Sequence, residues 1–360
     1  MKRAICILLI AIISVLILAG CGTSNESTAL PTLTDSPAPL VSASGTVETT
    51  PDPTPEPTPI ATPKGTPAPA PGVGSTVYMT KEITPESLMA IYKALGREAT
   101  GNVAVKISTG EPGGKNYLAP DLIKDLVQSV DSTIVECNTA YGGRRGNTAM
   151  HMQAAEDHGY TAIAEVDIMD ADGFISLPVT NGKHLTEDRV GSHLENYDFV
   201  IVLSHFKGHE MGGFGGAIKN ISIGIASSVG KSLIHSAGKS ETGISMGTPQ
   251  DDFLESMAEA AKAVADYEGE NILYINVMNK LSIDCDCNSH PAKPTMADIG
   301  ILASLDPVAL DQACVDLVYA APDGQDLIAR MEFKNGVHTL EHGAEIGLGS
   351  RAYQVVSIDG

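Results

Sequence analysis

The chain has 360 residues, of which 43% are hydrophobic and 4% aromatic, and its net charge is −21. This length allows one large core or two modest ones. The acidic balance argues against a nucleic-acid partner, because proteins of that class neutralise phosphates with a basic surface.

Residues 1–21 have the pattern of an export signal. Lys2 and Arg3 precede an apolar run at residues 4–18, broken only by Ser14, which is short for a membrane span. The Leu-Ala-Gly-Cys sequence that ends at Cys21 resembles the lipobox of bacterial lipoproteins, in which the signal is removed and the cysteine carries the lipid. We therefore expect the protein to be anchored to the cell membrane through a lipid on Cys21, on the extracytoplasmic face.

Residues 22–76 are rich in Ser, Thr, Pro and Ala and contain few large apolar side chains. Such a segment cannot bury enough apolar surface to fold. Its prolines favour stiff polyproline-II conformations. We expect a disordered Pro/Ser/Thr-rich stalk, followed by a folded domain at residues 77–360.

Strands and helices alternate after the stalk. The first helix is predicted to begin at Thr84, with Pro85 in its first turn, and to end at Gly96. The predicted strands are residues 102–108, 133–138, 161–168, 198–204, 271–279, 298–303 and 353–358. The further predicted helices are residues 120–130, 148–158, 217–227, 251–267, 307–319 and 325–331. This alternation predicts an α/β fold, a mostly parallel sheet with helices on both faces.

Polar or glycine-rich turns follow the first four of these strands, at residues 109–115, 139–146, 169–173 and 205–216. In a parallel sheet, the turns that follow the strands share one edge. Ligands bind at that edge in open α/β sheets, so we expect the functional site there.

The glycine-rich turn, which leads into the helix predicted from Ala217, carries most of the candidate site residues. Five glycines between Gly208 and Gly216 indicate an unusual backbone conformation or a close approach to a ligand. The predicted ligand-binding residues are Lys207, Gly212, Gly213, Gly215, Gly216 and Asn220. The predicted catalytic residues are His209, Glu210 and Lys219. The alternative is a tight turn with solvated charges.

Two other patterns in the sequence are candidates for anion binding. The Gly-Lys-Ser sequence at residues 230–232 resembles the end of a phosphate-binding loop, but Ile225 stands where that loop requires its first glycine. We therefore reject a nucleotide loop. Arg144 and Arg145 lie between glycines and either bind an anionic ligand or are solvated. We include Arg144 among the ligand-binding candidates.

Cys285 and Cys287 form the second informative pattern, with Asp284, Asp286 and His290 beside them. Thiolates, carboxylates and an imidazole are metal ligands, so a metal or cluster site is expected here. A redox thiol and inert cysteines are the alternatives. A disulfide between the two is not expected, because so short a ring is strained. Thiolate and imidazole together suit zinc or iron, so we predict that either cysteine sulfur lies close to a ring nitrogen of His205 or His209.

The remaining cysteines of the folded domain differ in their setting. Cys314 lies on an apolar helical stripe with Leu310 and Leu317, which predicts a core position. Cys137 ends a predicted strand at the proposed functional edge and is a candidate third ligand.

Several motifs in order resemble the domain of unknown function 362 family, often labelled uncharacterised iron–sulfur-centre proteins. They lie at residues 205–220, 284–287 and 298–313, and the resemblance covers nearly all of residues 102–359. Many members that carry the label have a ferredoxin-like insertion of two Cys-x-x-Cys-x-x-Cys runs. The matching interval here, residues 235–252, contains no cysteine. The resemblance therefore implies the fold, while an iron–sulfur cluster is less favoured than mononuclear zinc or iron.

These observations combine into one functional expectation and three alternatives. We expect a lipid-anchored extracytoplasmic protein with a metal-assisted site, built from Cys285, Cys287, His205 and His209, that binds or transforms a small anionic ligand. The alternatives are a non-enzymatic capture lipoprotein for a metal or ligand, an iron–sulfur redox protein, and a cell-surface interaction module whose site has decayed.

Overall fold

The computed structural model describes residues 74–360. The predicted signal peptide, the lipidation site Cys21 and the predicted stalk up to residue 73 lie outside the described residues. Within them, the first element begins at Ser75, two residues before the predicted start of the domain.

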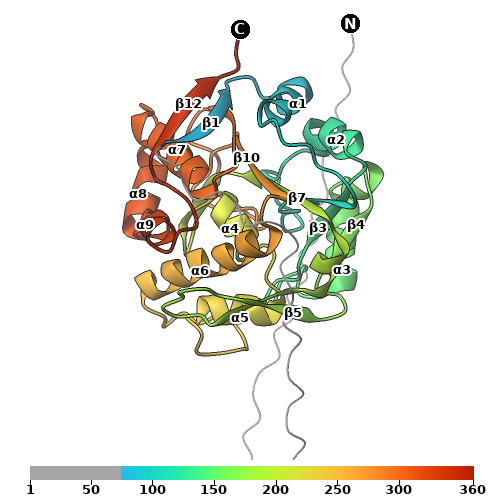
Figure 1. The fold of residues 1–360 in the computed structure, drawn as a ribbon, viewed down its shortest axis with the longest axis vertical. Helices are drawn as coiled ribbons and strands as arrows, with labels where there is room; N and C mark the ends of the chain where they lie inside the picture. Colours follow the sequence, from blue (N-terminus) through green and yellow to red (C-terminus); the bar gives the residue numbers. More distant parts are fainter. Residues whose placement is uncertain (1–73) are drawn as a thin grey trace, which may run out of the picture. The chain divides into compact units, whose positions relative to one another are not determined.

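An eight-stranded sheet forms the centre of the domain (Figure 1). Its strands, in spatial order, are β12 (Tyr353–Ser357), β1 (Ser75–Thr80), β11 (Gly300–Ser304), β10 (Ile272–Met278), β7 (Phe199–His205), β2 (Val103–Lys106), β3 (Thr133–Glu136) and β4 (Val166–Ile168). Neighbouring strands are parallel except at β11, which is antiparallel to both β1 and β10. The predicted fold class, a mostly parallel sheet with helices on both faces, is confirmed.

The helices form a layer on each face of this sheet. The helices α1 (Pro85–Ala94), α2 (Pro120–Ser129) and α3 (Thr148–Asp157) cover one face. On the other face, α4 (Ala217–Ile221) and α7 (Pro307–Ala320) contact the strands, and α5 (Ser228–His235), α6 (Gln250–Glu268), α8 (Gln325–Phe333) and α9 (His338–Glu345) pack beyond them. None of the helices in residues 74–360 combines the length and hydropathy that crossing a bilayer requires.

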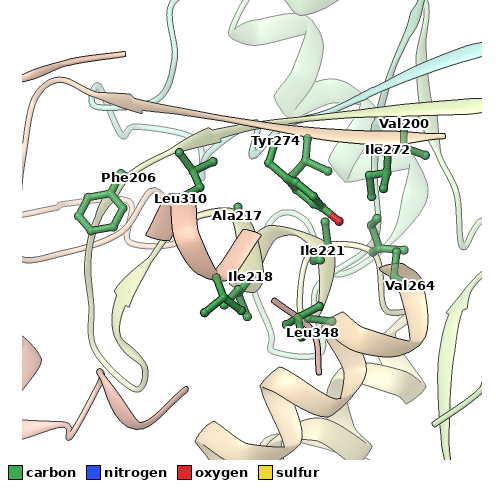
Figure 2. Packing of buried hydrophobic residues seen from close by; sticks show 14 of the residues in the cluster. Val200, Phe206, Ala217, Ile218, Ile221, Val264, Ile272, Tyr274, Leu310 and Leu348 are labelled. Carbon is green, nitrogen blue, oxygen red and sulfur yellow. The ribbon is translucent and has the colours of Figure 1, made fainter. Parts of the chain in front are cut away.

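Alternate residues of the strands supply the two cores. Val103 and Val105 of β2 are buried with α1 and α2, whereas Ala104 is buried on the opposite face. Figure 2 shows that second face, where Tyr274 of β10 lies above Ile221 of α4. Because successive side chains of a strand point to opposite faces, a strand covered on both sides must be apolar throughout.

Two predicted elements are shorter in the structure. The helix expected at residues 217–227 ends at Ile221, and α5 starts after Ser227, whose side chain accepts a hydrogen bond from Gly230 N. The backbone turns between them, with Gly224 packed against Asn220 O. The strand expected at residues 161–168 begins only at Val166, because residues 160–162 form a 3₁₀ turn.

The sequence did not reveal several short elements. They are β1, the hairpin of β5 (Phe174–Pro178) and β6 (Glu187–Gly191), the hairpin of β8 (Lys207–His209) and β9 (Gly213–Gly215), and the helices α5 and α9. These segments are three to eight residues long. At such lengths, hydrophobic periodicity gives a weak signal.

Candidate functional site

Four loops meet at the carboxyl edge of the sheet. They follow β2, β3, β7 and β10, which are parallel to one another. Backbone hydrogen bonds join three of them, from Glu111 N to Asp286 O and from Gly208 N to Ser282 O, each 2.8 Å. The prediction that the turns share one edge is confirmed for these loops, and the glycine-rich segment contacts the cysteine segment directly.

Cys285 and Cys287 form a disulfide with a Cα–Cα distance of 5.2 Å. The expectation that they would not be bridged is therefore wrong. The spacing in the sequence suggested a strained ring, but the chain turns sharply here and brings the Cα atoms within the range of about 4.4–6.8 Å that disulfides require. Cys287 N also donates a hydrogen bond to the Sγ of Cys285 at 3.2 Å, which fixes this turn.

His209 lies beside the bridged cysteines. One of its ring nitrogens and the two sulfur atoms all lie within 4.8 Å of one another. The structure thus brings together His209, Cys285 and Cys287, as the sequence predicted.

The ring of His209 is neutral and its tautomer is defined by its contacts. The Nδ1 atom accepts hydrogen bonds from Gly212 N at 2.8 Å and from Met211 N at 3.3 Å. Burial and the nearby cation Lys219 hold the pKa of His209 well below its usual value. The single ring proton therefore resides on Nε2, which is a hydrogen-bond donor.

His205 does not join this group, which corrects the prediction that it shares a metal site. Its Nε2 donates to the carbonyl of Asn279 at 2.6 Å, and its Nδ1 lies 3.2 Å from both Lys207 Nζ and Asp286 Oδ2. Both ring nitrogens therefore have protein partners.

Lys207 and Asp286 form a buried ion pair beside His205. Burial alone would raise the pKa of Asp286, but Lys207 and His205 lower it below its usual value. Burial also lowers the pKa of Lys207, and Asp286 opposes that change. Lys207, predicted to bind a ligand, instead holds the cysteine loop to β8.

A second buried network of charged side chains lies at this edge of the sheet. Lys106 Nζ contacts Glu136 at 2.9 Å, and Arg145 contacts both Glu136 at 3.3 Å and Glu111 at 2.9 Å. Burial alone would raise the pKa of Glu136, but Lys106, His151 and Arg145 lower it well below its usual value. Arg145, rather than the exposed Arg144, is thus the arginine of this site, because its guanidinium reaches two carboxylates.

Lys219 and Asn220 follow the glycine segment on α4. Asn220 binds Lys106 Nζ, Lys106 O and Ser204 Oγ through its amide, so its role is to join α4 to the strands. Among the described residues, the ammonium of Lys219 has no hydrogen-bond or ion-pair partner. Burial and the neighbouring cations Lys207 and Lys106 lower the pKa of Lys219 to about 7. The predicted catalytic candidate Lys219 is therefore partly a neutral amine at pH 7.

The loop glycines pack against the chain itself. A Cβ on Gly216 would lie 2.3 Å from Asp311 Oδ1, and one on Gly213, whose φ is +79°, would lie 3.0 Å from Gly336 Cα. The Asp311 carboxylate accepts hydrogen bonds from Ala217 N at 2.8 Å and Ile218 N at 3.0 Å. The N-terminus of α4 is thus capped by a side chain, and these close approaches account for Gly213 and Gly216 without a ligand.

A cavity of about 390 Å³ opens at this edge of the sheet. Its lining residues are Glu111, Tyr141, Gly143, Glu210, Asp284, Cys285, Cys287, Asn288 and Ser289. The exposed Glu210, a predicted catalytic residue, lies in this lining. Three of the lining side chains are carboxylates, and Tyr141 donates to Glu111 at 3.0 Å. The cavity is therefore polar and acidic, with the disulfide in its wall.

Lys106, Glu111 and Glu136 were not predicted from the sequence, Asp286 was predicted only as a possible metal ligand, and Arg145 was left between ligand binding and solvation. A usable signal existed for two of them, because Lys106 and Glu136 end strands that are otherwise apolar. A charged residue at the carboxyl end of a buried strand lies at the edge where parallel-sheet sites form.

The remaining cysteines lie apart from this group. Cys137 is buried and donates to Ile225 O at 3.1 Å, so it is not a third ligand. Cys314 is buried in the core, as predicted.

These contacts decide how well the site fits a metal. An iron–sulfur cluster usually takes four cysteines, and the described residues bring no more than two together. Mononuclear zinc or iron would need two thiolates and an imidazole lone pair. The sulfurs are bonded to each other, and Nδ1 of His209 already accepts two amide protons while Nε2 bears the ring proton. The site in this state therefore does not fit either metal centre.

Comparisons with known proteins show what this chain is similar to. Residues 103–316 match the family described as Domain of unknown function (DUF362). No curated protein matches the chain. Two solved structures show distant similarity, the lactate racemase apoprotein from Thermoanaerobacterium thermosaccharolyticum, with 16% identity and a TM-score of 0.35, and a protein from Thermotoga maritima, with 13% identity and a TM-score of 0.37.

These structural similarities cover only parts of the proteins. The alignments span 57% and 74% of this chain, and 51% and 59% of the racemase apoprotein and the Thermotoga protein, respectively. At TM-scores below 0.5, they support no argument about the site.

Proposed function

We propose a thiol–disulfide function for this chain, which belongs to the domain of unknown function 362 family. The reactive group is the Cys285–Cys287 pair, and its partner is a small thiol or disulfide that enters the cavity of about 390 Å³. One observation carries the proposal: a disulfide between cysteines two residues apart forms part of the wall of a polar cavity.

The short ring favours a chemical role over a structural one. In the chain-entropy account, a disulfide that closes a three-residue loop stabilises a fold by about 1.6 kcal/mol, against about 3 kcal/mol for a 15-residue loop. The cysteine loop is already held by the buried pair of Lys207 and Asp286. The disulfide therefore contributes little to the stability of the fold.

The two sulfurs differ in accessibility, which gives the exchange a direction. Cys285 is buried, whereas Cys287 is half-buried. The thiolate of the small molecule attacks Sγ of Cys287, the bond between the cysteines breaks, and its electron pair remains on Cys285. Cys287 N, 3.2 Å from the Sγ of Cys285, stabilises that thiolate. A second small thiol then releases a small disulfide and leaves the reduced pair.

His209 is a proton donor beside the sulfurs. Its ring carries the proton on Nε2, and a ring nitrogen lies within 4.8 Å of both sulfur atoms. A thiolate formed during exchange would attract this donor.

Mass spectrometry after alkylation tests the proposal. The folded wild-type protein, treated with 2-mercaptoethanol and then iodoacetamide, should gain two alkyl groups, at Cys285 and Cys287. With 2-hydroxyethyl disulfide in place of the thiol, the free Cys287 thiol of Cys285→Ser should exchange into a stable mixed disulfide and release 2-mercaptoethanol, and Cys287→Ser should react more slowly because Cys285 is buried.

Cys314→Ser is the matched control, because that thiol lies in the core and takes no part in the exchange. A pair that is reduced only when the protein unfolds would show that the bridge is structural and would contradict the proposal.

A second candidate is the metal-assisted site expected from the sequence, acting on a small anionic ligand. The proximity of His209 to Cys285 and Cys287 favours it. It would require reduction of the pair and transfer of the His209 proton to Nδ1, with loss of the hydrogen bond from Gly212 N. Zinc or iron bound by the reduced protein, and released on reoxidation, would support this candidate. Binding without a chemical step would instead support the capture lipoprotein.

The cellular location belongs to the same proposal. The lipobox-like sequence supports a lipid anchor on Cys21, which would place the cavity outside the cytoplasmic membrane. Oxidising compartments allow disulfides to persist, which agrees with a bridged cysteine pair. Cys21→Ser should release the protein from the membrane fraction or leave an unprocessed precursor. A variant that is processed and membrane-bound like the wild type would rule out the anchor.

A further inference from the structure

A second group of titratable side chains lies around α6, which packs beside α9 (Figure 1), and shares no residue with the lining of the cysteine cavity. It contains His184 from the loop between β5 and β6 and Asp252 and Glu255 from α6, and His338 of α9 contacts Glu255. We propose that this group is a binding site for a divalent transition cation, zinc by its donor set.

The donor atoms already converge. One donor atom each of His184, Asp252 and Glu255 lie within 4.8 Å of one another. Both imidazoles contact the same carboxylate, with His184 Nε2 2.5 Å from Glu255 Oε2 and His338 Nε2 3.1 Å from Glu255 Oε1. Two imidazole nitrogens and two carboxylates are a ligand set that zinc takes.

The surroundings of the group resemble the outer shell of a metal site. Nδ1 of His338 lies 3.3 Å from Glu341 Oε2, so a carboxylate orients the ring whose other nitrogen faces Glu255. Ligating histidines usually have such a partner, because it fixes the ring and its tautomer.

The loop that carries His184 is held independently of any cation. Glu259, one helical turn after Glu255, is buried and accepts hydrogen bonds from Lys183 N at 2.7 Å and Leu185 N at 2.8 Å. His342 Nε2 lies 3.1 Å from Glu259 Oε1, the oxygen that also accepts from Lys183 N. Preorganisation of this kind reduces the cost of ordering ligands when a cation binds.

Two mobile ammonium groups now supply the positive charge that the carboxylates require. Lys183 Nζ lies 2.7 Å from Glu255, and Lys239 Nζ lies 3.6 Å from Asp252. Their side chains are 60% and 68% exposed, so either lysine can swing into solvent with little loss. A single divalent cation would replace the two positive charges of Lys183 and Lys239.

Zinc titration of the full chain, with Cys285 and Cys287 replaced by serine, tests the site without interference from the thiols. Calorimetry or competition with a chromophoric chelator should give saturable binding of one zinc per chain. His184→Ala and Asp252→Asn should each weaken this binding by about tenfold or more, as loss of a ligand or its partner does. Lys183→Ala should leave the affinity equal or higher, because it removes a competing charge.

His193→Ala is the matched control, because His193 contacts Asp167 and Asp172 at another surface and has the same exposed fraction as His338, 22%. It should bind zinc like the parent protein. Absence of saturable binding in the parent, or equal affinities for the parent and His184→Ala, would overturn the proposal. Far-ultraviolet circular dichroism and the Tm of each variant without zinc would separate lost ligation from lost folding.

Discussion

Asp286, the residue between the two bridged cysteines, forms a buried ion pair with Lys207 of β8. The contact joins the loop after β10 to the hairpin after β7. The position of the disulfide therefore depends on an ion pair that neither cysteine forms.

Removing one partner of this pair should destabilise the fold strongly. Asp286→Asn leaves Lys207 buried without its counter-ion, a change that costs about 3–5 kcal/mol in comparable buried pairs. The double variant Asp286→Leu with Lys207→Met should cost less, because it leaves no unpaired charge. Urea unfolding at pH 7 measures both. The pKa of Asp286 is lowered in the fold, so the wild type should lose this advantage as the pH falls below about 4. Equal costs for the single and double variants would contradict the argument.

Gly216→Ala should destabilise the fold without touching the cavity lining. The new Cβ would lie 2.3 Å from Asp311 Oδ1, so either the cap of α4 or its first turn must move. Overpacking of this kind costs about 1–3 kcal/mol. Gly142→Ala is the control, since nothing lies within 4 Å of its added Cβ. The difference between the two variants in thermal unfolding measures the effect, and equal Tm values would show that the contact relaxes freely.

Asp188 should make the stability fall as the pH rises. Burial raises the pKa of Asp188 to about 8, although Lys231 lowers it in part. The unfolded chain releases this proton near pH 3.9, so between about pH 4 and 8 the native state binds more protons and the free energy of unfolding decreases with pH. Asp188→Asn has no charge to bury and should gain stability over the wild type across this window, by a few kcal/mol in order of magnitude above pH 8. Urea unfolding at several pH values checks this, and a difference independent of pH would refute it.

Lys219→Met should stabilise the fold at low pH. The pKa of Lys219 is about 7 in the fold and near 10.4 when unfolded, so the unfolded state binds more protons between these values. Lys219 therefore costs stability below about pH 7, and this cost disappears as the pH rises toward about 10. The Tm of Lys219→Met should exceed that of the wild type at pH 6, and less so at pH 9. Lys293→Met, at an exposed lysine, should show no such trend.

The edge that carries the site could be predicted because the strands that form it are long apolar runs. β7 and β10 are buried throughout their seven residues, so their ends, and the loops that follow, were visible in the sequence. The proximity of His209 to Cys285 and Cys287 followed from that shared edge. The direction of each strand was harder to predict from the sequence, since β11 is as apolar as its neighbours yet runs antiparallel to them.

The internal partners of the site could not be predicted. Asp286 looked like a possible ligand in a polar loop, and only the folded chain shows it buried against Lys207. The disulfide was missed for a related reason. Sequence spacing gives the size of the ring, but the turn that closes it depends on contacts with residues far away along the chain.

The direction of β1 has a consequence for how the cavity is displayed. β1 is antiparallel to β11, which is antiparallel to β10, so β1 runs in the same direction as the strands that carry the site. Ser75 consequently lies at the amino edge of the sheet, while the cavity opens at the carboxyl edge. Under the proposed anchoring through Cys21, the tether would join the domain at the side opposite its entrance. Under the proposed thiol–disulfide function, a small thiol would then reach Cys287 from the side of the domain away from Ser75.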